Sequence, residues 1–124
     1  SGYFRFQSCA AVGLNQIAVQ ANGDVCVCQG DSRSHQHVIG NIVTDAIDDM
    51  LSTPEAQQWE NLHTLYRDEC LHCDSIFACG GGCPLQAEVL FGSRSHIDKA
   101  SCVFYKKVTD WLIQKCYLLS LDNK

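Results

Sequence analysis

Four of the nine cysteines in this 124-residue chain fall within the fourteen residues from Cys70 to Cys83. Three consecutive glycines separate Cys79 from Cys83. Thiols this dense are typical of sites that bind metal or form disulfides, because a free thiol gains little from thiol neighbours. Glycine has no side chain and lets the backbone turn tightly against a bulky group. The stretch therefore predicts a site built from sulfur ligands.

The other cysteines are spread along the chain, at Cys9, Cys26, Cys28, Cys102 and Cys116. A secreted disulfide scaffold usually has an even number of cysteines and a signal peptide, and neither is apparent here. We therefore expect a reducing, cytoplasmic setting in which the cysteines bind metal. Cys116 lies outside the pattern of the others and is predicted to be a buried free thiol.

The remaining eight cysteines make two sets of four, and two kinds of metal centre suit them. Iron–sulfur clusters are usually held by four thiolates, and structural zinc ions accept the same ligands. The residues alone leave open an iron–sulfur module, a structural zinc domain that recruits a partner or peptide, and a stand-alone ferredoxin-like carrier. The compact ferredoxin run, with two residues between each of three cysteines, is absent.

Residues 14–28 have the pattern of a β-hairpin. Asn22-Gly23 is the favoured pair for a two-residue turn with positive φ at both positions. Side chains alternate between the two faces of a strand, so Cys26 and Cys28 are expected to point the same way and to reach one site. The apolar residues that alternate on either side of the turn are Ile17, Val19, Val25 and Val27.

Helical spacing of apolar residues recurs in the rest of the chain. It predicts helices over residues 44–51, 52–66, 84–90 and 103–119, with polar loops over 29–38 and 93–99. The last helix is expected to be amphipathic, and Trp59, Phe104 and Trp111 are expected in the core. The fold class is α+β: a small hairpin, several helices and long loops organised around metal clusters, in one domain over residues 1–124.

Composition excludes several other functions. The net charge of −5 would repel a nucleic acid, and no apolar run reaches the roughly 18 residues that a membrane span needs. We find no pair of carboxylates and no Ser/His/Asp set suited to catalysis. The chemistry is expected to reside in the sulfurs.

The cysteine pattern resembles that of the SPASM domain, the auxiliary-cluster module of radical S-adenosylmethionine enzymes that modify peptides and proteins. The resemblance spans residues 9–102 and also includes the segments Gly40-Asn41-Ile42 and Cys79-Gly-Gly-Gly-Cys83-Pro84. It rests on a spacing of cysteines and one glycine in the order Cys9, Gly23, Cys28, Cys70, Cys73, Cys79, Cys83 and Cys102.

The resemblance implies two auxiliary 4Fe-4S clusters with interleaved ligands. The second would be held by Cys70, Cys73, Cys79 and Cys102, and the first by Cys9, Cys28 and Cys83. Many members supply a fourth ligand a few residues after the Cys9 position, where this chain has none. Either Cys26 takes that place, which we prefer, or one iron stays open to substrate, water, His35 or His37. His72 is a candidate donor of a hydrogen bond to a cluster sulfur.

The chain lacks the Cys-x-x-x-Cys-x-x-Cys motif of a radical S-adenosylmethionine core. It is therefore not expected to cleave S-adenosylmethionine by itself. The resemblance implies a part of a longer enzyme whose partners are the catalytic core, in the same natural polypeptide, and a peptide or protein substrate. Its expected roles are electron transfer and substrate positioning.

Overall fold

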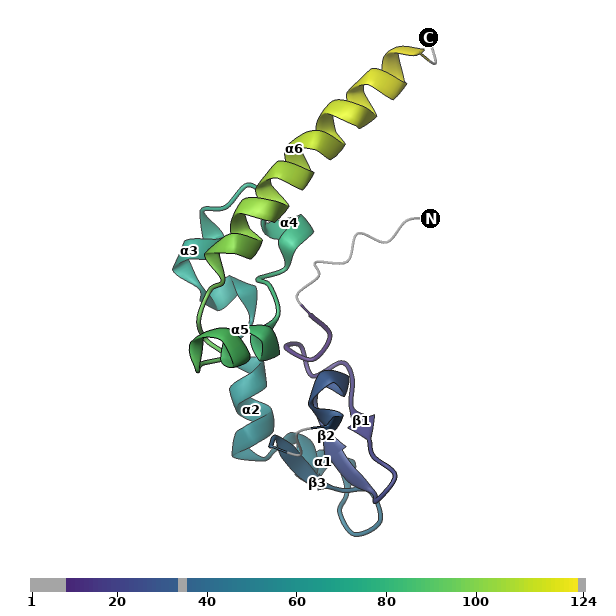
Figure 1. Cartoon of the computed structure of the whole chain (residues 1–124). Coiled ribbons are helices and arrows are strands. Elements are labelled where there is room, and N and C mark those ends of the chain that lie inside the picture. The colour runs from purple at the N-terminus through teal and green to yellow at the C-terminus, as the bar shows by residue number, and fades with distance from the viewer. Residues whose placement is uncertain (1–8, 34–35, 123–124) are drawn as a thin grey trace.

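The structure is a computed structural model, and it describes residues 9–33 and 36–122. Within these residues the chain forms a three-stranded antiparallel sheet and six α-helices, which confirms the predicted α+β class (Figure 1). The helices are α1 (Ile47–Leu51), α2 (Pro54–Glu60), α3 (Asp68–Leu71), α4 (Ile76–Cys79), α5 (Pro84–Phe91) and α6 (Lys99–Asp122). Two 3₁₀ helices, Gln29–Arg33 and Thr64–Tyr66, connect them.

The sheet contains the predicted hairpin and a third strand. β1 (Ala18–Val19) pairs with β2 (Asp24–Cys26), which pairs with β3 (Val38–Asn41). The hairpin loop differs from the predicted two-residue turn, because residues 21–23 form a three-residue loop closed by a 2.9 Å bond from the Gly23 N–H to the Gln20 carbonyl. Only Gly23 has a positive φ there, +89°, so the predicted positive φ is found at Gly23 but not at Asn22.

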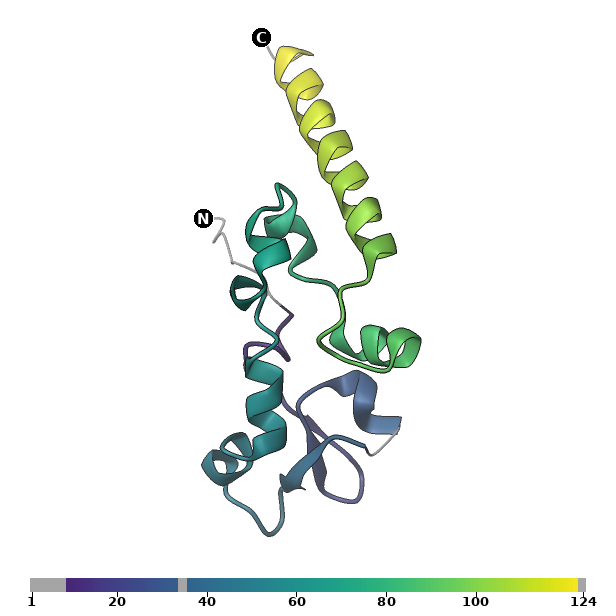
Figure 2. The ribbon, with the colours of Figure 1, turned by 90° about the vertical axis from the view of Figure 1, so that its left-hand side faces the viewer.

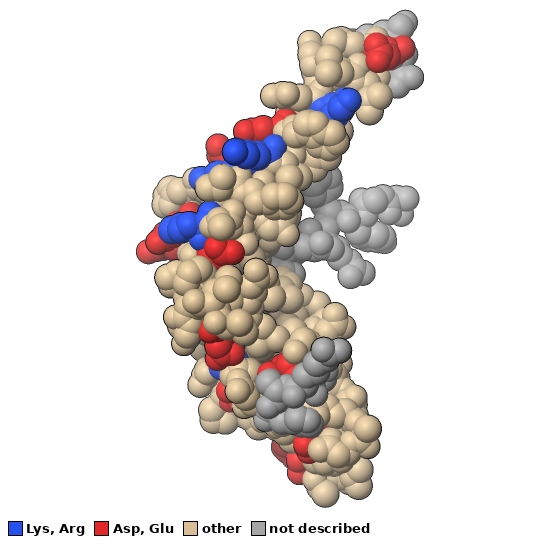
Figure 3. Space-filling model, viewed as in Figure 1, with Lys and Arg blue, Asp and Glu red and all other residues tan. Residues whose placement is uncertain are grey.

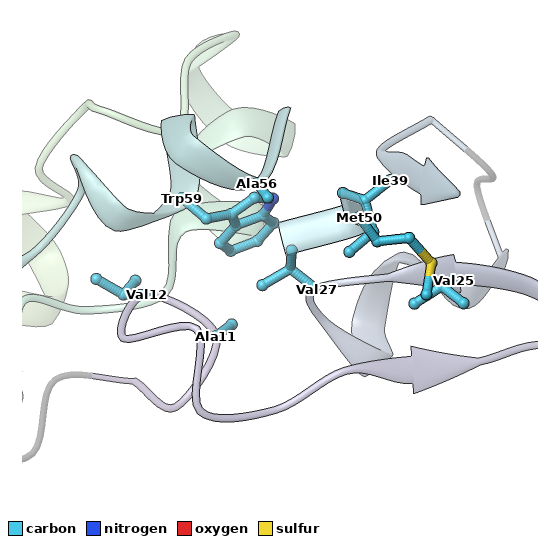
Figure 4. Packing of buried hydrophobic residues seen from close by; sticks show 8 residues of the cluster. All are labelled: Ala11, Val12, Val25, Val27, Ile39, Met50, Ala56 and Trp59. Atoms are coloured by element: carbon cyan, nitrogen blue, oxygen red, sulfur yellow. The ribbon is translucent and has the colours of Figure 1, made fainter. Parts of the chain in front are cut away.

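The core lies between the sheet and the two helices that follow it. Trp59 is fully buried on α2 and belongs to one buried cluster with Val27 and Met50; in Figure 4, Val27 lies next to the Trp59 ring and Met50 next to Val25. Gly40 allows this packing, since a Cβ at its position would meet the Met50 Cγ at 2.5 Å. The other buried members of the cluster are Ala11, Val12, Val25, Ile39 and Ala56.

A network of charged side chains covers one side of Trp59. The two ring nitrogens of His37 lie 3.1 Å from Glu55 Oε1 and 2.8 Å from Glu88 Oε2. The Arg94 guanidinium lies 2.6 Å from the same Glu55 oxygen and 5.1 Å from the Trp59 ring centre. The network ties the segment before β3 to α2, to α5 and to the loop before α6.

Helix α2 begins and ends differently from the predicted helix over residues 52–66. Thr53 caps α2: its Oγ1 accepts the Ala56 N–H at 3.3 Å, with Pro54 at the first helical position. The helix stops at Glu60 instead of continuing to Tyr66, whose side chain is exposed.

Helix α6 extends away from the rest of the domain (Figure 2). Its first turns contact α4, and none of its residues is buried within the described chain. The prediction that Phe104 and Trp111 belong to the core is therefore wrong for this domain: their side chains are 60% and 56% exposed. The helix has the predicted apolar residues, but no element of the described chain covers them. No helix in the described residues combines the length and apolarity needed to span a membrane.

Candidate metal centres

Four cysteines predicted to act together line one cavity. We call Cys70, Cys73, Cys79 and Cys102 the second cysteine group; the cavity that they line has a volume of about 420 Å³. Three short elements bring them there, because α3 carries Cys70, the loop after α3 carries Cys73 and α4 ends at Cys79. Cys102 comes from the first turn of α6, which packs on α4.

The thiols of this group lie close enough to influence one another. Burial raises the pKa of the Cys70 thiol, the Arg67 guanidinium opposes that rise, and charges on Cys102, Cys79 and Cys73 add to it. Burial likewise raises the pKa of Cys102, and charge on Cys79 and Cys73 raises it further. The metal-free thiols repel each other as thiolates, so a bound cation or cluster would relieve that repulsion.

Three further cysteines, which we call the first cysteine group, are Cys9, Cys28 and Cys83. Burial raises the pKa of the Cys28 thiol, and negative charge on Cys9 or Cys83 raises it further. The Gly30 N–H lies 3.4 Å from the Cys28 sulfur and opposes the rise. The fold thus brings together cysteines from the segment before β1, the end of the hairpin and the start of α5.

Cys26 is fully buried beside this group. β2 ends at Cys26 and is irregular between Val25 and Cys26, so strand alternation does not extend to Cys28 as the prediction assumed. The Cys26 sulfur accepts a 3.2 Å hydrogen bond from the Gln20 amide. Among the influences that raise its pKa, burial is the largest, and Cys28 is one of the nearby charges. Its role as fourth ligand stays a prediction.

The glycine turn separates the two groups. Gly80, Gly81 and Gly82 all have positive φ, at +61°, +89° and +77°, a conformation that residues with side chains rarely adopt. The Arg67 guanidinium lies 3.4 Å from the Gly81 carbonyl, and the Thr64 hydroxyl donates to the Gly80 carbonyl at 2.9 Å. These contacts hold the glycine turn, and Cys79 and Cys83 lie at its two ends.

Three histidines were candidates from the sequence. His35 lies outside the described residues. His37 was expected on the loop surface or at an open iron; instead it is buried, with both ring nitrogens against carboxylates. His72 lines the cavity of the second group, and its Nδ1 lies 3.1 Å from the Asp68 carbonyl oxygen. A hydrogen bond from His72 to a cluster sulfur stays a prediction.

The structure corrects the prediction for one cysteine and places two lysines at the site that the sequence reasoning missed. Cys116 is exposed on α6, not buried as predicted, because nothing in the described chain covers that part of the helix. Lys99 and Lys106 line the cavity with the second group. Lys99 lies three residues before Cys102 and Lys106 four residues after it, and residues at these spacings are neighbours on a helix surface. The spacing could therefore have indicated that both lysines lie near Cys102.

The donor set suits iron–sulfur clusters. Soft thiolates are the ligands that such clusters prefer, and the second group lines one cavity with four thiols. Within residues 9–33 and 36–122, no three His, Cys, Asp or Glu side chains converge closely enough to hold a single metal ion. The cavity of the second group is large enough for a ligand bulkier than one ion.

Comparison with known proteins identifies the class of domain. The profile of the SPASM family, an iron–sulfur cluster-binding domain, matches residues 9–74, which is more than half of the chain. The chain belongs to this family of iron–sulfur cluster-binding domains. Cys79, Cys83 and Cys102 lie beyond the matched residues.

One curated relative is similar to the chain over most of its length. The chain is 26% identical over 110 residues to the radical SAM cyclopropyl synthase TigE of Paramaledivibacter caminithermalis. The alignment covers 89% of this chain and 22% of the relative, so the chain spans about a fifth of that protein's length. No solved structure matches the chain.

Proposed function

We propose that this chain is an auxiliary domain that binds two 4Fe-4S clusters for a radical S-adenosylmethionine enzyme acting on a peptide or protein. The second cysteine group would hold one cluster; Cys9, Cys28 and Cys83, with Cys26, would hold the other. The observation that supports the proposal is that Cys70, Cys73, Cys79 and Cys102 line one cavity, whereas Cys9 and Cys83 lie near enough to Cys28 to raise the pKa of its thiol.

The protein's own contribution is to hold, bury and hydrogen-bond the sulfurs. The Gly30 N–H donates to Cys28 and the Gln20 amide to Cys26, and such bonds raise the reduction potential of a cluster. When bound, clusters would supply one-electron transfer, and an iron without a protein ligand would supply a contact for substrate. A glycine turn between Cys79 and Cys83 keeps the two sites apart within one short segment.

The proposed partner is the catalytic core of a longer polypeptide. The relative that the chain resembles is described as a radical SAM enzyme, and the chain corresponds to only a fraction of it. The exposed apolar side chains of α6 support a partner, because a helix face of this kind is normally buried against protein. A peptide or protein substrate is proposed on the family resemblance.

The test is anaerobic reconstitution of the 124-residue chain followed by iron, sulfide and zinc analysis. We expect about eight irons and eight sulfides per chain if both clusters are of the 4Fe-4S type. The matched control is Cys116→Ser, which changes an exposed thiol outside both groups and should leave the yield unchanged. Tightly bound zinc without inorganic sulfide or broad thiolate-to-iron absorbance would overturn the proposal in favour of a structural zinc domain.

A further inference from the structure

The cavity of the second cysteine group carries an excess of positive charge. Besides the cysteines, its charged lining residues in the described chain are the two lysines Lys99 and Lys106 and the carboxylate Glu69. The whole chain has a net charge of −5, so this local excess runs against the overall balance. Figure 3 shows blue and red side chains gathered where α3 meets the base of α6.

The two lysines are not equivalent. The Lys99 ammonium pairs with the Glu69 carboxylate across the mouth of the cavity, so part of its charge is balanced. Lys106 makes no ion pair within the part of the chain that the structure describes. It lies one turn after Cys102 on α6, with its side chain against the same cavity.

Positive groups lie beside the sulfurs of this group. Lys99 and Lys106 line the same cavity as Cys102, three residues before it and four residues after it on α6. Cys102 also lies in the first turn of the 24-residue α6, where the aligned peptide dipoles favour negative charge.

We propose that Lys106, supported by Lys99, stabilises the reduced form of a cluster held by the second cysteine group. The inference rests on the proposed function, because it requires a cluster at this site. A cluster bound by thiolates carries net negative charge, and one-electron reduction adds another negative charge. A nearby cation lowers the energy of the reduced state more than that of the oxidised state.

The test is a redox titration of the reconstituted 124-residue chain, followed by electron paramagnetic resonance with dithionite as reductant. The Cys102→Ala variant supplies the signal of the first cluster alone. We expect Lys106→Gln to reduce the ratio of reduced to oxidised second cluster at a fixed potential by about three- to tenfold. A tenfold change corresponds to about 59 mV for a one-electron couple.

Two further variants distinguish an effect of the Lys106 charge from a structural effect of the substitution. Lys107→Gln removes the same charge from the next residue of α6, which does not line the cavity, and should change the ratio by less than twofold. Glu69→Gln removes the carboxylate and should change the ratio in the opposite direction to Lys106→Gln. A merely structural role would not give shifts of opposite sign. The Lys106→Gln shift should also shrink at 1 M salt, since exposed charges are screened.

Three results would each overturn the inference. The ratio of reduced to oxidised cluster could stay unchanged in Lys106→Gln, or it could change equally in Lys106→Gln and Lys107→Gln. It could also change in the same direction in Lys106→Gln and Glu69→Gln. Each of these results leaves the clusters in place and so leaves the proposed function standing. If the unmodified chain takes up no iron and sulfide, both the proposed function and the inference fail.

Discussion

Cys83 lies near enough to Cys28 for negative charge at Cys83 to raise the pKa of the Cys28 thiol. Cys79, only four residues earlier, acts in the same way on Cys70 and Cys102. Two cysteines within one short segment thus face different partners, on either side of three glycines with positive φ. This arrangement supports the proposal that the Cys70–Cys83 stretch contributes to two sites.

Replacing Cys102 with Ala should remove the second cluster and spare the first, because Cys102 belongs only to the second group. Iron and sulfide should fall to about four each per chain. Metal analysis with Mössbauer spectroscopy checks the result. Cys116→Ser is the control, and equal loss of both clusters would refute the division of ligands.

Replacing Cys26 with Ser tests the fourth ligand of the first cluster. If Cys26 binds iron, the change alters the electron paramagnetic resonance spectrum of that cluster and lowers its occupancy. If the spectrum stays the same, the Cys26 sulfur serves only as acceptor for the Gln20 amide, and the iron has another ligand. Gln20→Ala, which removes the donor but keeps the thiol, is the matched variant.

The sequence predicted the hairpin and the helix over α5 because both depend on local signals. Gly23 supplies the positive φ of the turn, and Pro84 and Gly92 bound the helix. The two cysteine groups were predicted from the family resemblance, and their roles as ligands stay a prediction because the grouping depends on long-range packing.

The failures concern contacts between distant segments. His37 looked like a loop residue, but its burial depends on Glu55 and Glu88, which lie far along the chain. Trp111 has the periodicity of a core residue, yet periodicity shows only that a helix has an apolar face and not what covers it. Cys116 was misplaced for the same reason.

Gly81 and Gly82 offer a matched test of the glycine turn. Both have a left-handed conformation, but a Cβ at Gly81 would meet the Thr64 Oγ1 at 2.8 Å, whereas nothing lies within 4 Å of one at Gly82. We expect Gly82→Ala to reduce the free energy of unfolding by about 1 kcal/mol and Gly81→Ala by about 2–3 kcal/mol. Urea denaturation checks the difference, and equal losses would show that Thr64 moves aside freely.

Arg94→Ala should destabilise the domain by about 2–3 kcal/mol. The change leaves Glu55 and Glu88, both partly buried, without their arginine partner and removes the cation above the Trp59 ring. Arg94→Lys should recover less than half of the loss, because an ammonium cannot reach both Glu55 and Gln58 in the same fork. Urea denaturation measures both variants. A loss below 0.5 kcal/mol for Arg94→Ala, about the level of a surface change, would contradict the role of the network.

The metal-free chain should lose stability as the pH rises above about 8.5, the ordinary pKa of a thiol. Burial raises the pKa of Cys26, Cys28, Cys70 and Cys102 in the folded chain. Below pH 8.5 the thiols are protonated in both the folded and the unfolded state, so their contribution to stability is fully present. Above it the unfolded chain releases its protons first, which favours unfolding until the folded thiols also titrate.

Urea denaturation of the reduced, metal-free chain from pH 6 to 10 checks this expectation. The free energy of unfolding should show little dependence on these thiols up to about pH 8 and then fall. Cys70→Ser removes one of the titrating groups and should make the fall shallower. Because ligation requires thiolates, cluster assembly should release protons and speed up over the same pH range. A free energy of unfolding that stays constant or rises between pH 8 and 10 would contradict the raised pKa values.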